Sequence, residues 1–170
     1  MGFVDTNPAA LRALRQTIAA VWPEVLLPSE GYEHAGGILE QTQIKREAYE
    51  SLGYPRAQIE LPPAAVWAHS PMTMVVYEQP ALVYYVGTTE SGDSVPFRSK
   101  VKLLQDRLLD PVFGLVDGAT ATVFTVLPAT FQTHVYDRDM LNELLLVRNQ
   151  YAQGGALQFS FLIGDDASDA

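Results

Sequence analysis

The strongest constraint on the fold of this chain is the segment 72–87, in which β-branched and aromatic residues predominate. Such residues favour extended backbone, because their side chains pack well on a pleated surface. The segment contains Pro80, which has no N–H to donate to a neighbouring strand and therefore requires an edge, a bulge or a junction between two strands. The sequence thus predicts a fold organised around a β-sheet with an irregularity at Pro80.

Three further segments, residues 64–68, 119–127 and 156–163, have the composition of strands. Residues 119–127 alternate small and bulky side chains, and residues 156–163 carry one strongly apolar face. Gly154 and Gly155 predict a turn before the last of these strands. Residues 144–147 fit either a strand or part of a short helix that begins near Asp137.

Two segments have the periodicity of amphipathic helices. Asn7 and Pro8 form a helix start, and apolar residues at spacings of three and four predict a helix over residues 8–22 that Pro23 ends. A second helix begins near Ser94 and Pro96, and its apolar stripe consists of Phe97, Val101, Leu104 and Leu108. Two clear helices are too few for a doubly wound sheet. The predicted fold class is therefore α+β, a mostly antiparallel β-sheet packed by two or three α-helices on one face.

Residues 25–63 give a weaker signal, because prolines and glycines punctuate the first part. Residues 38–52 fit a helix that ends at Gly53, and the whole segment is interpreted as an extended arm or an insertion. No repeat or linker divides the chain, so residues 1–170 are predicted to form a single domain. Residues 165–170 are expected to be a flexible acidic tail.

The chain is acidic, with 11 Lys and Arg against 20 Asp and Glu and a formal net charge of −9. This charge opposes binding to nucleic acid, for which we expect no specific affinity. The chain has no cysteine, which excludes disulfides, thiolate metal ligands and cysteine nucleophiles. No stretch approaches the ~18 uninterrupted apolar residues of a membrane span. We expect an intracellular protein that does not interact with membranes.

Candidate chemical groups are sparse. His134 lies near Asp137 and Asp139, but a general base also needs a nucleophile and an oxyanion site, and neither has a signature here. Two other groups of possible metal ligands lack the spacing of known sites: Glu30, Glu33 and His34, and Asp165, Asp166 and Asp169. The sequence therefore predicts no catalytic residue, no metal and no cofactor.

Aromatic residues provide a different indication, because tyrosine and tryptophan are enriched at protein interfaces. Five of them lie in predicted loops or near strand ends, where they either cover sheet edges or contact a partner. These candidate interface residues are Tyr32, Tyr54, Trp67, Tyr136 and Tyr151.

Three segments together resemble a known class of protein. The run Tyr77 to Gly87 (YEQPALVYYVG), the helix over residues 97–109 and the closing run Gly154 to Gly164 (GGALQFSFLIG) are similar to neck and tail-completion proteins of tailed bacteriophages, in particular the tail terminator family. The resemblance covers residues 64–164 and carries no catalytic residues.

The resemblance implies a virion structural protein that assembles in the host cytoplasm and forms a homo-oligomeric, commonly hexameric, ring. Such a ring ends the tail tube and joins it to the head connector or stopper, and DNA passes through it. Two alternatives remain open at this point. One is a small monomeric adaptor or chaperone that grips a partner helix, and the other is an enzyme with a noncanonical site near His134.

Overall fold

The computed structural model describes residues 8–22, 56–62, 64–69, 74–88, 97–112, 114–145 and 151–166. Their element order is α1 (Pro8–Val21), β1 (Arg56–Glu60), β2 (Ala65–His69), β3 (Met74–Thr88), α3 (Phe97–Leu108), β4 (Leu115–Asp117), β5 (Thr122–Tyr136), α4 (Arg138–Leu145) and β6 (Ala152–Asp166). This combination of helices with a separate antiparallel sheet confirms the α+β class.

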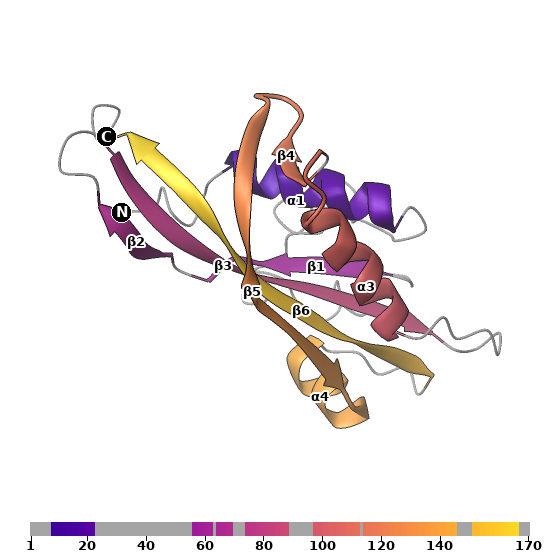
Figure 1. The fold of residues 1–170 in the computed structure, drawn as a ribbon. Coiled ribbons are helices and arrows are strands. Elements are labelled where there is room, and N and C mark those ends of the chain that lie inside the picture. Colours follow the sequence, from indigo (N-terminus) through magenta and orange to yellow (C-terminus); the bar gives the residue numbers. More distant parts are fainter. Residues whose placement is uncertain are drawn as a thin grey trace.

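The strands form one strongly twisted antiparallel sheet in the order β1-β3-β6-β5-β4, with β2 also paired to β3 (Figure 1). Its centre is the ladder between β3 and β6, which pair along their whole length from Met74 opposite Asp166 to Thr88 opposite Ala152. On its other edge, β6 pairs with β5. The two strands at the centre of the sheet are therefore far apart in the sequence.

Strand β3 runs without interruption through Pro80, so the segment forms one strand and not two strands that meet at Pro80. β1 and β2 occupy successive parts of the same edge of β3, with Glu60 opposite Leu82 and Ala65 opposite Glu78. Pro80 thus faces the gap between β1 and β2, where its missing N–H interrupts no pairing with either strand. The buried Gln79 side chain closes this gap by donating a hydrogen bond to the carbonyl oxygen of Pro62.

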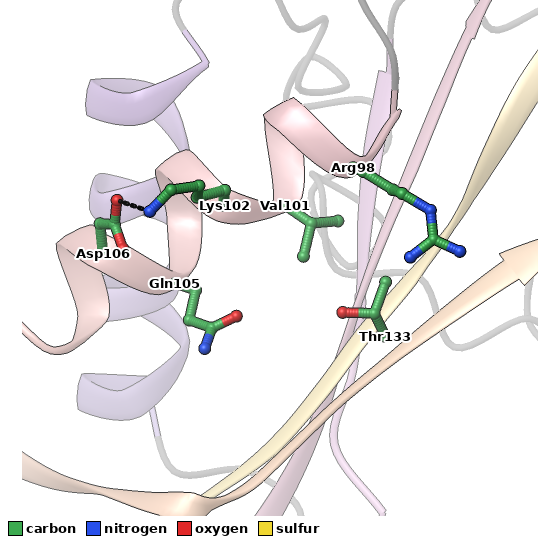
Figure 2. A pocket seen from close by; sticks show the side chains of 6 residues that line it. All are labelled: Arg98, Val101, Lys102, Gln105, Asp106 and Thr133. Atoms are coloured by element: carbon green, nitrogen blue, oxygen red, sulfur yellow. Dashed lines mark hydrogen bonds and ion pairs between the residues drawn. The ribbon is translucent and has the colours of Figure 1, made fainter.

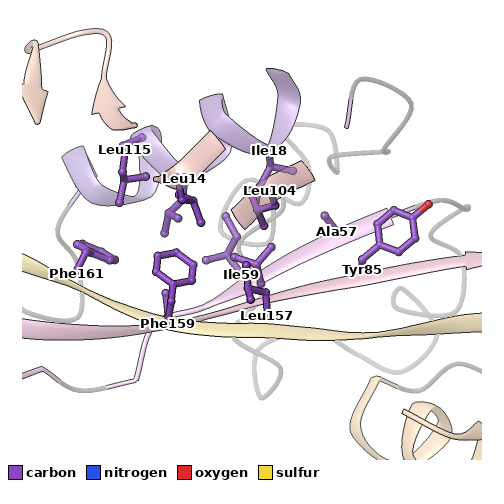
Figure 3. Packing of buried hydrophobic residues seen from close by; sticks show 14 of the residues in the cluster. Leu14, Ile18, Ala57, Ile59, Tyr85, Leu104, Leu115, Leu157, Phe159 and Phe161 are labelled. Atoms are coloured by element: carbon purple, nitrogen blue, oxygen red, sulfur yellow. The ribbon is translucent and has the colours of Figure 1, made fainter. Parts of the chain in front are cut away.

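Helices α1 and α3 cover one face of the sheet and enclose the hydrophobic core (Figures 1 and 3). The four stripe residues predicted for the second helix are all buried, from Phe97 at its start to Leu108 at its end. Leu14 and Ile18 of α1 belong to the same core cluster as Leu157 and Phe159 of the sheet, and none of these four side chains is exposed. The periodicity of the apolar residues therefore identified the buried side of α3 correctly.

The short helix α4 packs against β6 and β5 on the opposite face of the sheet (Figure 1). Its Leu141 is only 2% exposed but is not part of the main core. Because side chains alternate along a strand, Tyr84 and Ala156 also point to this second face, away from Tyr85 and Leu157. Residues 138–145 thus form the helix that was one of two interpretations near Asp137, and residues 146 and 147 lie outside the described residues.

Gly154 and Gly155 do not form the predicted turn, because both lie inside β6, opposite Val86 and Tyr85. A side chain at Gly154 would collide with the carbonyl oxygen of Tyr85, and one at Gly155 would collide with that of His134. These glycines therefore allow the backbones of three neighbouring strands to approach closely. In the sequence, a glycine pair required for this reason looks the same as a glycine pair in a turn.

The predicted strand ended at residue 127, but β5 continues to Tyr136 after an irregularity of four residues in its pairing with β6. Leu127 lies opposite Ser160 and Gln132 opposite Gln158, so residues 128–131 share the position opposite Phe159. The Thr130 hydroxyl accepts a hydrogen bond from the Ser160 N–H at 2.8 Å and donates one to the Leu127 carbonyl at 2.6 Å. One side chain thus replaces ladder bonds that this irregularity removes.

Part of the segment interpreted as an arm or insertion belongs to the sheet, since β1 comprises residues 56–60. The helix expected over residues 38–52 lies outside the described residues. At the other end, β6 continues through Asp166, and residues 167–170 of the expected tail are outside the described part. None of the described helices has the length and apolar character needed to cross a membrane.

Candidate functional site

His134 and Asp137, the centre of the alternative enzyme hypothesis, each bond to a different partner. His134 Nε2 lies 2.9 Å from Oε1 of Gln158 on the neighbouring strand β6. Asp137 Oδ1 accepts a hydrogen bond from the backbone N–H of Met140 at 2.8 Å, so Asp137 caps the first turn of α4. Asp139 lies in that same first turn and is exposed. The three residues are thus close in sequence, but the hydrogen bonds of His134 and Asp137 do not join them to each other.

The five candidate interface residues are only partly placed by the structure. Tyr32 and Tyr54 lie outside the described residues. Trp67 is in β2, at the position where the register with β3 shifts, and its side chain is outside the described part. Tyr151 lies just before β6 and is 48% exposed, which suits a contact residue. The proposed interface role of these residues stays a prediction.

Tyr136 belongs to a small aromatic cluster on the second face of the sheet. Its ring centroid is 6.3 Å from that of Tyr84, which is 6% exposed and donates a 2.6 Å hydrogen bond to the Glu60 carboxylate. Burial, and next the negative charge of Glu60, raise the pKa of the Tyr136 hydroxyl above its usual value. Tyr136 therefore contributes to packing within the chain as well as to the surface.

The sequence interpretation missed a buried carboxylate that joins α1 to the β4–β5 turn. Both oxygens of Asp117 accept hydrogen bonds from the Arg12 guanidinium, at 3.1 and 2.9 Å, and the Asp117 side chain is fully buried. The Thr120 hydroxyl and the Ala119 N–H donate to the same carboxylate, while Gln16 accepts from the Gly118 N–H. The local run Asp-Gly-Ala-Thr is typical of a turn, but the partner of Asp117, Arg12, is 105 residues away and no local pattern indicates it.

We expect Asp117 to make stability depend on pH in the acid range. The hydrogen bonds from Arg12 and then from Thr120 hold the pKa of the Asp117 carboxyl well below its usual value. Its stabilising effect is thus complete above the ordinary aspartate pKa of about 4 and is lost as the pH falls below it. The free energy of unfolding is measured with urea at neutral pH and near pH 3. Its decrease between these two pH values should be smaller in Asp117→Asn than in the parent chain.

Asp106→Asn is the matched control, because Asp106 pairs with Lys102 at the surface, where both side chains are well exposed. Its pH dependence should follow that of the parent chain. An Asp117→Asn variant with the parent's neutral stability and the parent's pH dependence would contradict the assigned role of this carboxylate.

An apolar hollow of about 310 Å³ lies between the end of α3 and the β4–β5 hairpin. Its lining includes Leu109, Val112 and Val123, which are 41%, 76% and 70% exposed. Large apolar side chains that gather at an exposed hollow are typical of protein contact sites. This surface, which we call the hairpin hollow, was not identified from the sequence because its residues come from three separate segments.

A second hollow, of about 320 Å³, lies between α3 and β5 and has a polar lining (Figure 2). Arg98, Val101, Lys102, Gln105 and Asp106 line it from α3, and Thr133 lines it from β5. We call it the α3–β5 groove. Arg98 and Lys102 are exposed on α3, and strand β5 faces them across the groove.

Among the residues that the structure describes, no three His, Asp or Glu side chains gather as a metal site. The sequence matches no protein-family model and no curated protein.

Proposed function

We propose that this chain is a structural protein of a tailed-phage virion, a tail terminator or neck component that acts through contacts with other proteins. The hairpin hollow carries the proposal, because Val112 and Val123 expose most of their apolar surface there. Burying such a surface against another protein is favourable by ~25 cal/mol per Å² of apolar area removed from water. The similarity of residues 64–164 to tail terminators supplies the particular role.

A ring requires two different surfaces on each subunit, so that one copy contacts the next in a head-to-tail manner. The hairpin hollow is one such surface, and the matching surface lies elsewhere on the neighbouring copy. In this proposal the ring, of six subunits, contacts the last ring of tail-tube protein on one side and the head connector or stopper on the other. The net charge of −9 suits a conduit, because it disfavours retention of passing DNA.

The proposed function involves no catalytic residue, metal or cofactor. The chain would be made in the host cytoplasm and act in the neck of the virion. In this role the sheet and its core support contact residues at the surface. Assembly depends on such surfaces, whereas catalysis would require reactive groups that converge at one site.

Substitution at the hairpin hollow tests the proposal. Light scattering and negative-stain microscopy should show rings of about six times the 18.7 kDa subunit mass, either alone or with the tail-tube protein encoded in the same genome. Val112→Asp and Val123→Asp should reduce ring formation at least tenfold, because each places a charge in the buried contact. Circular dichroism should show unchanged secondary structure, because both residues are exposed.

Leu103→Asp is the control, because Leu103 is 51% exposed on α3 but is not part of the hairpin hollow. It should leave assembly intact. A chain that stays monomeric at its highest soluble concentration, and also in the presence of the tail-tube protein, would overturn the ring proposal.

A further inference from the structure

Part of one edge of β5 is not paired with another strand in the portion of the chain that the structure describes. β6 pairs with β5 on one side as far as Tyr136, whereas β4 pairs only with residues 122–124 on the other side. No described strand pairs with the outer edge of residues 132–136, where Gln132 and Thr133 are exposed and Val135 is 50% exposed. An open strand edge presents unpaired N–H and C=O groups to any extended chain that approaches it.

The α3–β5 groove lies beside this open edge. Thr133 pairs with Leu157, whose side chain is part of the core, so the Thr133 side chain points to the face that α3 covers. In Figure 2 the Arg98 guanidinium and the Thr133 side chain point toward one another across the groove. A strand added to β5 would therefore direct every second side chain into the space below α3.

The groove is suited to an acidic side chain. Lys102 Nζ and the Asp106 carboxylate form an ion pair at 3.0 Å, which balances their charges. Arg98 is exposed and makes no hydrogen bond or ion pair to any residue in the described ranges, so its guanidinium is available. The chain as a whole is acidic, but at physiological ionic strength charges further than ~8 Å are largely screened. The nearby Arg98 thus determines which charge the groove accepts.

We propose that residues 132–136 of β5 bind an extended segment of a partner protein as an added strand, and that Arg98 binds an Asp or Glu side chain of this segment within the α3–β5 groove. Backbone hydrogen bonds along β5 provide affinity, and the Arg98 guanidinium, which can donate two parallel hydrogen bonds to one carboxylate, provides selectivity for an acidic side chain. This surface is separate from the hairpin hollow, and the proposal does not depend on the function proposed above.

A pair of short peptides tests the charge preference. The probes are the fluorescein-labelled hexapeptide TVEVTK and its counterpart TVKVTK, in which lysine replaces the glutamate, and binding is followed by fluorescence anisotropy. The acidic probe should bind at least tenfold more tightly than the basic one. Arg98→Glu should reverse this preference, and Arg98→Lys should retain it with weaker binding. The control Arg138→Glu changes an exposed charge on α4 and should leave the preference unaltered.

Hydrogen exchange tests the position of the bound strand. The acidic probe should slow amide exchange within residues 132–136 and leave β1, on the opposite edge of the sheet, unchanged. Absence of binding, equal binding of both probes, or binding that leaves exchange at residues 132–136 unaltered would each overturn the proposal. Self-association of the chain that slows the same amides and is lost in Arg98→Glu would also overturn it, because a second copy would then occupy the edge.

Discussion

Replacing Gly155 with alanine is expected to lower the free energy of unfolding by ~3 kcal/mol or more, at the upper end of the range for overpacked sites. The added Cβ would collide with the backbone carbonyl of His134 and would lie 2.8 Å from Cε2 of Phe97. A flexible side chain can move away from such a contact, but here the obstacles are the neighbouring strand β5 and the first residue of α3. The β5 backbone must therefore shift relative to β6, and the Phe97 ring must move as well.

Urea unfolding followed by circular dichroism measures this effect. Gly118→Ala is the matched control, because the nearest atom to a Cβ at Gly118 is the amide oxygen of the Gln16 side chain, at 3.2 Å, which can move. Its free energy of unfolding should change by less than ~1 kcal/mol. If Gly155→Ala were as stable as this control, β5 and β6 could not approach as closely as described here.

Replacing Trp22 with alanine is expected to lower the free energy of unfolding by ~3–5 kcal/mol, the usual range for a buried tryptophan. Trp22 is fully buried at the end of α1, where its ring meets that of Tyr85 edge to face with centroids 5.0 Å apart. Its Nε1 donates a hydrogen bond to the carbonyl oxygen of Lys100 in α3, at 3.0 Å. One side chain thus connects α1, α3 and β3.

Trp22→Phe separates the two contributions of this residue. Phenylalanine retains much of the apolar contact but cannot donate to Lys100, so the loss should be smaller than that of Trp22→Ala. Leu103→Ala, at a position that is 51% exposed, serves as the surface control and should cost less than ~1 kcal/mol. A Trp22→Ala variant as stable as this control would show that α1 does not dock on α3 through Trp22.

The sequence predicts those parts of the fold that depend on local periodicity. The first helix was predicted over residues 8–22 and is found at Pro8–Val21, because its start and end are marked by prolines and its apolar residues recur at helical spacing. Residues 72–87 were predicted to be extended because of their β-branched and aromatic composition, and β3 comprises Met74–Thr88. Residues 56–60 were missed as a strand, since Arg56, Gln58 and Glu60 are neither β-branched nor aromatic and the segment depends on pairing with β3.

The remaining differences come from contacts between distant residues. Gly154 and Gly155 have the local appearance of a turn, and only the closeness of Tyr85 and His134 explains their place inside a strand. The surface hollows also depend on contacts between distant residues, because Arg98 of α3 and Thr133 of β5 line the same α3–β5 groove. Ion pairs between distant residues are equally inaccessible to local patterns, as the link between Arg12 and Asp117 shows. Tyrosine and tryptophan residues led to the prediction of an interface, but the topology decides which of these residues lie together on the surface.

The ladder between β3 and β6 also determines when the chain can fold. Its innermost pair joins Thr88 to Ala152 and its outermost joins Met74 to Asp166, so a ribosome must synthesise the chain through Asp166 before the whole ladder can close. Sheets dominated by such remote pairings fold in roughly milliseconds to seconds, far more slowly than helical bundles. During synthesis the apolar side of β3 is without its partner strand. A nascent chain of this kind needs protection from aggregation until β6 emerges.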